Sequence, residues 1–236
     1  MNTMIRKIDS SLYPGYSHRW DDQLFRERIL PHVGPEKTVL DLGAGAGIVE
    51  AMNFKGLAKK VCGVDLDPRV EANPMLDEGR LADAGHIPYP DQAFSLVFAD
   101  NVVEHLADPL AVFREVHRVL KPGGVFLFKT PNKTHYVPTI ARLTPHPFHQ
   151  FINRLRGRAE SDTFPTLYRA NTLADVQRIG REAGFEVRSV SRIEGRPEYL
   201  RITWPTYLLG AAYERTVNAS ECLAMFRILL IAELRK

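Results

Sequence analysis

The fold is decided by one stretch of the sequence, Val39-Leu-Asp-Leu-Gly-Ala-Gly-Ala-Gly47. An apolar run of the kind found in buried strands leads into a turn with glycine at every second position. Glycine is needed where the backbone takes positive φ, or where a ligand must lie against it without an intervening Cβ. The carboxylate of Asp41 can accept backbone N–H bonds from this turn and can face a ligand ammonium. The stretch predicts a strand over 38–42, a ligand-facing turn, and a helix that starts near Ala46.

The ligand class follows from two details of this turn. A lone glycine-rich turn is weak evidence, and it also fits a plain strand–turn–helix connection. The dinucleotide pattern requires glycine at position 48, where this chain has Ile48. Asp41 would also place a negative charge near a pyrophosphate. Both details argue against NAD and favour a ligand that carries positive charge and no phosphate.

Outward from this stretch, short apolar runs alternate with amphipathic segments, which is typical of a parallel sheet covered by helices. One helix is expected to begin at the N-cap Asp108 with Pro109 in its first turn, and another to run from Thr172 to Gly184. Residues 1–36 form an N-terminal extension with helical character over 21–30, and the proline-rich residues 131–170 form an insertion. The remaining strands are expected at 60–64, 80–82, 94–99, 125–128, 185–190 and 226–232.

Acidic or amide side chains follow the predicted strands where each one ends. Asp65 comes 22 residues after the first glycine of the turn, an interval at which a carboxylate can accept both hydroxyls of a ribose. Asp83 can accept a bond from an adenine amino group, or it can simply cap Gly85. Asp100 and Asn101 end the fourth strand, at the edge where such sheets bind ligands. The pattern predicts a nucleoside site along this edge.

The order of these segments, together with the run "EH…DP…LKPGG" between Glu104 and Gly124, resembles the class I S-adenosylmethionine-dependent methyltransferases. The resemblance covers residues 36–132 well. It implies an α/β fold with a Rossmann-like, doubly wound, seven-stranded sheet, whose last strand runs antiparallel beside the fifth, plus a helical cap over 131–170. It also implies that residues 37–236 form the methyltransferase domain and that Tyr16–Trp20 form a flap over the cofactor.

The resemblance implies S-adenosylmethionine as the cofactor, with its methionine part near the glycine turn, its ribose at Asp65 and its adenine at Asp83. The expected cofactor-binding residues are Asp41, Gly43, Ala44, Gly45, Gly47, Asp65, Leu66, Asp83, Ala84, Asp100 and Asn101.

The expected reaction moves a methyl group to oxygen, nitrogen or carbon of a small-molecule or lipid-like acceptor by in-line displacement. A general base would help with a poorly acidic acceptor, and the candidates are His135, Tyr136 and His105. Two alternatives stay open, an NAD(P)-linked oxidoreductase and a non-catalytic nucleotide-binding protein. No metal site is expected, because no cysteine or histidine ladder has metal-ligand spacing.

Composition sets limits on partners and location. The chain has 236 residues, a formal net charge of +3 and two cysteines. These features make nucleic acid an unlikely partner and favour a reducing, cytoplasmic setting without a transmembrane segment. Residues 131–170 carry six basic against two acidic residues. This excess fits an anionic substrate, peripheral contact with an anionic lipid surface, or a solvated helix face. The sequence does not indicate the oligomeric state.

Overall fold

The computed structural model describes residues 3–16, 19–143 and 165–236. These residues divide into two compact units. The sheet unit comprises residues 21–130, 166–191 and 230–236, and the helical unit comprises the described residues within 1–20, 131–165 and 192–229. The helices are α1 (Thr3–Leu12), α2 (Trp20–Ile29), α3 (Pro109–Val119), α4 (Tyr136–Leu143), α6 (Leu173–Glu182) and α7 (Trp204–Asn218). The strands are β1 (Thr38–Leu42), β2 (Lys60–Asp65), β3 (Glu78–Leu81), β4 (Phe94–Asp100), β5 (Leu120–Pro131), β6 (Glu186–Ile193) and β7 (Leu229–Arg235).

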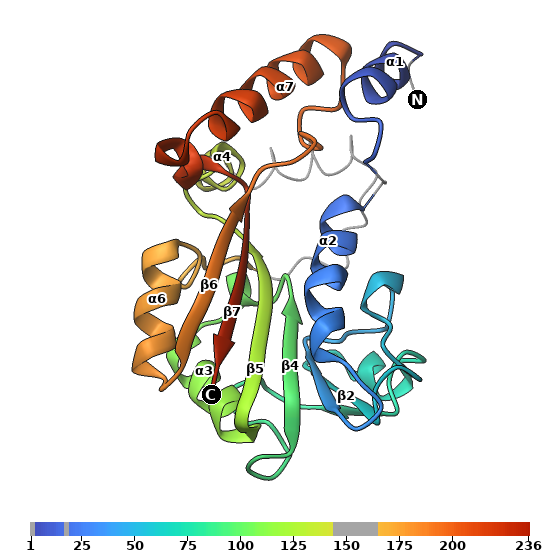
Figure 1. The fold of residues 1–236 in the computed structure, drawn as a ribbon, viewed down its shortest axis with the longest axis vertical. Coiled ribbons are helices and arrows are strands. Elements are labelled where there is room, and N and C mark those ends of the chain that lie inside the picture. The colour runs from blue at the N-terminus through green and yellow to red at the C-terminus, as the bar shows by residue number, and fades with distance from the viewer. Residues whose placement is uncertain (1–2, 17–18, 144–164) are drawn as a thin grey trace. The chain divides into compact units, whose positions relative to one another are not determined.

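The seven strands form one sheet in the order β3-β2-β1-β4-β5-β7-β6. The pairs β1–β2, β1–β4, β2–β3 and β4–β5 are parallel. β7 is antiparallel to β5, because Lys236 N donates to Gly124 O and Asn132 N to Ile228 O, so partner numbers rise on one strand as they fall on the other. Figure 1 shows the β7 arrow pointing opposite to β4, β5 and β6. The seven-stranded α/β sheet with an antiparallel last strand is confirmed.

Alternation along the strands sorts their side chains between two faces of the sheet. Leu40, Val97 and Phe126 lie in the core cluster that also holds the buried residues of α3 and α6. Asp108 caps α3 by accepting from Ala111 N, and Thr172 caps α6 by accepting from Asp175 N, so both predicted helix starts are confirmed. α3 and α6 therefore cover one face.

The opposite face carries Asp41, Phe98 and Lys129, from β1, β4 and β5. α2 covers this face: its Phe25 and Ile29 are fully buried, and its acidic first turn pairs with Lys129. The helical character predicted over 21–30 is confirmed by α2. Because helices lie on both faces, the sheet is doubly wound. The polar side chains of this second face lie beneath α2.

The prediction of a helix that starts near Ala46 is wrong. After the glycine turn the chain forms only one short 3-10 helix, Glu50–Met52. Gly47 at φ +72° and the extended Val49 interrupt any helical run, and Gly56 at φ +82° turns the chain again. The carbonyls that a helix would have satisfied are satisfied by a side chain instead, since Arg26 of α2 donates to Ala51 O and Asn53 O.

Several strand bounds also differ from those expected. The last strand is β7 at Leu229–Arg235 rather than 226–232, because a 3-10 helix occupies Glu221–Phe226 and the strand continues through charged residues to pair with the start of β5. β5 is longer at both ends than 125–128, β6 extends to Ile193, and β3 lies two residues earlier than 80–82 at its start.

The helical unit has a small core of its own. Ile5 and Tyr13 from the first segment pack with Tyr207 and Ala211 of α7. Asp9 of α1 accepts from Tyr207 Oη at 2.7 Å and pairs with Arg201 at 2.5 Å. The expected extension over 1–36 is thus divided, with α1 in this unit and residues from Asp21 onward in the sheet unit. No helix in the described part of the chain combines the length and apolar character needed to cross a bilayer.

Candidate cofactor site

The predicted cofactor residues lie at or just beyond the carboxyl ends of four neighbouring parallel strands. Asp41 lies near the end of β1, Asp65 ends β2 and Asp100 ends β4. Asp83 follows β3 by two residues. All belong to the sheet unit. Since parallel strands end at one edge of the sheet, the fold brings these four carboxylates to the same edge.

The glycine turn is fastened to β2. Gly43 N donates to Val64 O at 2.8 Å, and Gly45 N donates to Asp65 Oδ2 at 2.8 Å. Asp65 Oδ1 accepts from Asp67 N, also at 2.8 Å. Each carboxylate oxygen of Asp65 therefore holds one backbone N–H, and its remaining lone pairs stay available to a ligand.

The three glycines of the turn all have positive φ, but only one faces open space. A Cβ on Gly43 would lie 2.3 Å from Val102 Cγ2, and one on Gly47 would lie 2.3 Å from Asn73 Oδ1. A Cβ on Gly45 would meet only Asp65 Oδ2, at 3.8 Å. Gly43 and Gly47 are thus required by packing, whereas Gly45 leaves room for a ligand beside Asp65.

Asn73 supports the turn from beneath and was not identified from the sequence. Its Nδ2 donates to Ala44 O at 3.0 Å and to Gly45 O at 3.2 Å, and its Oδ1 accepts from Met75 N at 2.9 Å. The sequence offers only an Asn-Pro dipeptide at this position, which indicates a turn. Its contact with a turn 28 residues away arises from the tertiary fold.

Asp41 is buried without a partner. Its side chain is on the α2 face of the sheet, the residue is 8% exposed, and no hydrogen bond or ion pair joins its carboxylate to another described residue. Burial raises its pKa well above the ordinary value, and the neighbouring Asp100 and Asp65 raise it further. A carboxyl group in this position is stabilised in its charged form by a cation and not by a pyrophosphate.

Lys129 is the second residue that sequence reasoning missed. It is fully buried on β5, where its Nζ lies 2.5 Å from Asp22 Oδ1, 2.9 Å from Asp100 Oδ1 and 3.1 Å from Asp21 Oδ2. Burial alone would lower the pKa of Lys129, but these carboxylates raise it above its usual value. Burial raises the pKa of Asp100 to about 6, although Lys129 opposes the shift. A lysine that ends the apolar run of β5 was the available signal.

The other predicted residues are placed as follows. Asp83 Oδ1 accepts from Gly85 N at 2.6 Å, which is the capping geometry considered as its alternative role. Ala84 packs against the core, whereas Leu66 is exposed. Asn101 has φ +55°, and its Nδ2 donates to Asp100 Oδ1 at 2.9 Å. The left-handed backbone at Asn101 turns the chain at the sheet edge directly after Asp100.

A family model described as a methyltransferase domain matches residues 16–190, which is most of the chain and includes every residue of this site. The chain belongs to the class I S-adenosylmethionine-dependent methyltransferases. S-adenosylmethionine is accordingly its cofactor. The donor set fits it, since a carboxylate-lined site beside an open glycine suits a ligand with positive charge and a ribose.

Individual relatives agree with this family. A probable S-adenosylmethionine-dependent methyltransferase of Mycolicibacterium smegmatis is 37% identical over 128 residues, which cover 51% of this chain and 48% of the relative. The chain thus spans about half the length of that relative. A ubiquinone biosynthesis O-methyltransferase of Pseudomonas paraeruginosa is 28% identical over 208 residues, covering 78% of this chain and 85% of the relative. The structure of an S-adenosylmethionine-dependent methyltransferase from Mesorhizobium loti shares the fold, with 20% identity, a TM-score of 0.56, and coverage of 93% and 98%.

The methyltransferase motif "EH" contributes a buried carboxyl group beside the site. Glu104 is 4% exposed, its Oε2 accepts from Thr130 Oγ1 at 2.8 Å, and Thr130 Oγ1 accepts from Asn171 Nδ2 at 2.7 Å. Burial raises the pKa of Glu104 to about 7. His105, a candidate base, ends the 3-10 helix Val103–His105 and is half-buried.

The other two candidate bases of this methyltransferase lie in the helical unit. His135 is 1% exposed; its Nδ1 accepts from Val137 N at 3.2 Å, and its Nε2 lies 3.4 Å from Glu194 Oε2. Its ring packs against Tyr136 and Tyr213. Burial lowers the pKa of His135 to about 3 and raises that of Glu194 to about 8. Such a ring contributes to packing inside the unit.

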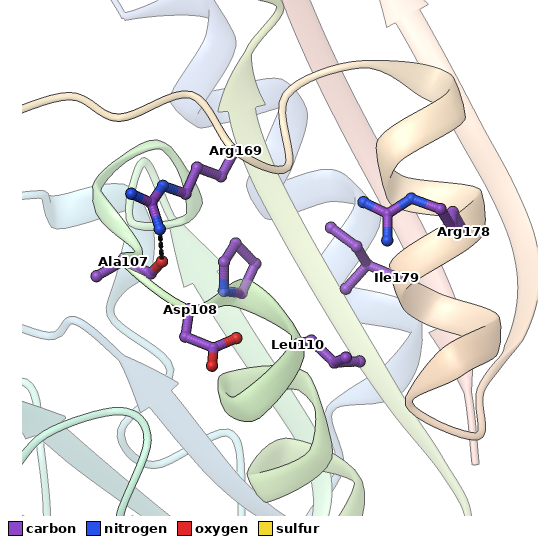
Figure 2. A pocket seen from close by; sticks show the side chains of 7 residues that line it. Ala107, Asp108, Leu110, Arg169, Arg178 and Ile179 are labelled. Carbon is purple, nitrogen blue, oxygen red and sulfur yellow. Dashed lines mark hydrogen bonds between the residues drawn. The ribbon is translucent and has the colours of Figure 1, made fainter.

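A shallow hollow of about 390 Å³ lies on the other face of the sheet unit, beside the start of α3 (Figure 2). Arg169 and Arg178 reach it from different segments, and Arg169 donates to Ala107 O at 2.5 Å. Its lining residues are Ala107, Asp108, Pro109, Leu110, Arg169, Arg178 and Ile179. None of the predicted cofactor residues lines this hollow, so it is separate from the cofactor site.

Proposed function

We propose that this chain transfers the methyl group of S-adenosylmethionine to a small-molecule or lipid-like acceptor, with the cofactor held at the carboxyl edge of β1, β2 and β4. The observation that carries the proposal is the unpaired, buried carboxylate of Asp41 beside the open space at Gly45. A dinucleotide would bring its pyrophosphate into this negative environment, which disfavours the oxidoreductase alternative.

The bound cofactor would supply an electrophilic methyl group on a sulfonium centre. The chain's own residues have to bind and orient the cofactor and the acceptor, and they have to exclude water from the site. We assign Asp65 to the ribose hydroxyls, because its two oxygens are held in place by Gly45 N and Asp67 N. We assign the positively charged methionine end to Asp41 and Asp100. Asp83 is assigned to the adenine on position alone.

The acceptor class is inferred from the names of similar proteins. The name of the ubiquinone biosynthesis O-methyltransferase supports an oxygen acceptor on a small or lipid-like molecule. We assign acceptor selection to the helical unit, which includes residues 131–143 of the predicted insertion. The basic residues Arg154, Arg156 and Arg158 of that insertion lie outside the described residues. A cytoplasmic setting and the exclusion of nucleic acid stay predictions.

We propose no general base. The burial and lowered pKa of His135 support a packing role, and its neighbour Tyr136 contacts the same aromatic group. An acceptor that is itself acidic, such as a phenol or a carboxylic acid, needs no strong base. Acidic hydroxyl compounds are therefore the first class to screen.

Calorimetry with S-adenosylhomocysteine, the demethylated product, tests the cofactor proposal. We expect micromolar binding, and no heat with NAD at the same concentration. A screen with S-adenosylmethionine labelled in its methyl group, over phenols, carboxylic acids and prenylated quinol precursors, would then identify the acceptor. Binding of NAD in place of S-adenosylhomocysteine would overturn the proposal.

A further inference from the structure

No described residue pairs with the Asp41 carboxyl group through a hydrogen bond or a positive charge. Its register partners are Gly63 on β2 and Phe98 on β4, and neither has a polar side chain. A buried carboxylate without a partner is costly, so the neutral, protonated form is favoured. The group is nevertheless placed at the ligand edge of the sheet, where polar side chains usually serve binding.

The charged groups that act on Asp41 are at the ends of β2 and β4. Asp65 and Asp100 are both acidic and both raise the pKa of Asp41. The lysine on this face of the sheet and an arginine of α2 are already engaged. Lys129 is surrounded by Asp100 and the two carboxylates of the first turn of α2, and Arg26 donates to two backbone carbonyls. A positive charge for Asp41 must therefore come from a ligand.

Space for such a charge exists next to these carboxylates. The carbonyl oxygen of Gly45 is held by Asn73, its N–H is held by Asp65, and its Cα faces open space. These hydrogen bonds thus hold the turn beside open space. A ligand cation there would stabilise the ionised form of Asp41, since an opposite charge within a few ångströms lowers a carboxyl pKa.

We propose that cofactor binding at this site is an exchange of charges, in which Asp41 holds a proton in the ligand-free protein and releases it to solvent when the positively charged cofactor enters. The O–H bond of the carboxylic acid breaks, the proton passes to water or buffer, and the carboxylate then pairs with the ligand cation. This inference rests on the proposed function and extends it to how the cofactor is recognised.

The exchange has two consequences. Affinity for S-adenosylmethionine rises with pH, because the competing proton becomes scarcer, until free Asp41 is itself ionised. In addition, Asp41 costs the ligand-free protein stability, since folding must either bury a charge or hold a proton. Asp41→Asn, which keeps the shape and removes the charge, should therefore stabilise the free protein and weaken cofactor binding.

Calorimetry of S-adenosylmethionine binding in two buffers of different ionisation enthalpy counts the protons released. The wild-type chain should release more protons per cofactor than Asp41→Asn, and the difference should shrink as the pH rises. The variant should bind about tenfold more weakly at pH 8 and unfold about 3 °C higher without ligand. Asp91→Asn is the matched control, because Asp91 is exposed and pairs with Arg118. It should behave as wild type in proton release and affinity.

The outcomes separate the two proposals. Tight binding with no proton release, or equal release by Asp41→Asn and wild type, would overturn the exchange and leave the cofactor assignment intact. A lower unfolding temperature for Asp41→Asn than for Asp91→Asn would also overturn it, because it would show that Asp41 has a stabilising partner. Absence of binding of both S-adenosylmethionine and S-adenosylhomocysteine to the wild-type chain would instead refute the proposed function.

Discussion

Gly45 N donates a 2.8 Å hydrogen bond to Asp65 Oδ2, and this bond joins the glycine turn after β1 to the end of β2. The two residues are 20 positions apart in the sequence. Through this bond one carboxylate both shapes the turn and presents its remaining lone pairs at the ligand edge. Because of this bond, replacing Asp65 should weaken the binding of both the ribose and the methionine end of the cofactor.

Asp65→Ala should weaken binding of S-adenosylhomocysteine by about 1–3 kcal/mol, because a charged hydrogen-bonding partner is lost. Calorimetry at pH 7.5 measures the effect. Asp67→Ala is the control, since Asp67 caps the adjacent 3-10 helix through Arg69 N and should change affinity little. Equal affinities for the two variants would remove Asp65 from the site.

Alanine at two glycines of the turn should separate packing from ligand space. Gly43→Ala should lower the free energy of unfolding by about 2 kcal/mol or more, because its Cβ would lie 2.3 Å from Val102 Cγ2 and its φ is +83°. Gly45→Ala should cost only about 1 kcal/mol, from its φ of +49°, yet weaken cofactor binding. Urea unfolding and calorimetry together test this. An unchanged affinity for Gly45→Ala would mean that no ligand approaches the turn there.

Lys129→Met should destabilise the sheet unit by about 3 kcal/mol, because three carboxylates would lose their shared counter-ion. The loss should be smaller at pH 5 than at pH 8, since protonation of Asp100, whose pKa is raised to about 6, relieves part of the repulsion. Adding Asp21→Asn and Asp22→Asn should restore part of the stability. Lys37→Met, at an exposed lysine, is the control in the same urea titrations. If Lys129→Met proved as stable as this control, the ion pairs of Lys129 would contribute nothing to the stability of the sheet unit.

Glu104 should make the ligand-free protein less stable as pH rises. Its folded pKa of about 7 is above the ordinary value of 4.5, so the folded state binds the proton more tightly and loses that advantage between pH 4.5 and 7. The slope for one such group is at most about 1.4 kcal/mol per pH unit. Glu104→Gln can still accept from Thr130, so it should match wild type near pH 4.5 and exceed it by about 1–2 kcal/mol at pH 8. Denaturant titrations across this range measure the difference, with the exposed Glu36→Gln as control. Parallel pH profiles for wild type and Glu104→Gln would show that Glu104 is ionised throughout.

Local signals in the sequence were sufficient for the elements that follow local rules. The caps at Asp108 and Thr172 are confirmed because a capping side chain bonds to backbone only three residues away. Regular alternation of apolar segments likewise predicted the sheet, and the motif set predicted the family. The helix expected after Ala46 failed because its replacement depends on Arg26, a side chain from a helix earlier in the chain.

By itself, the sequence determined the α/β class, the glycine turn, the order of the strand-end carboxylates and the family, because these depend on residue type and short spacing. Only the tertiary structure decided which of those carboxylates has a partner. Lys129 meets Asp21 and Asp22 across more than 100 residues, whereas no described cation pairs with Asp41. The physical reason is that charge balance in a buried site depends on distances in space, and chain spacing does not encode them.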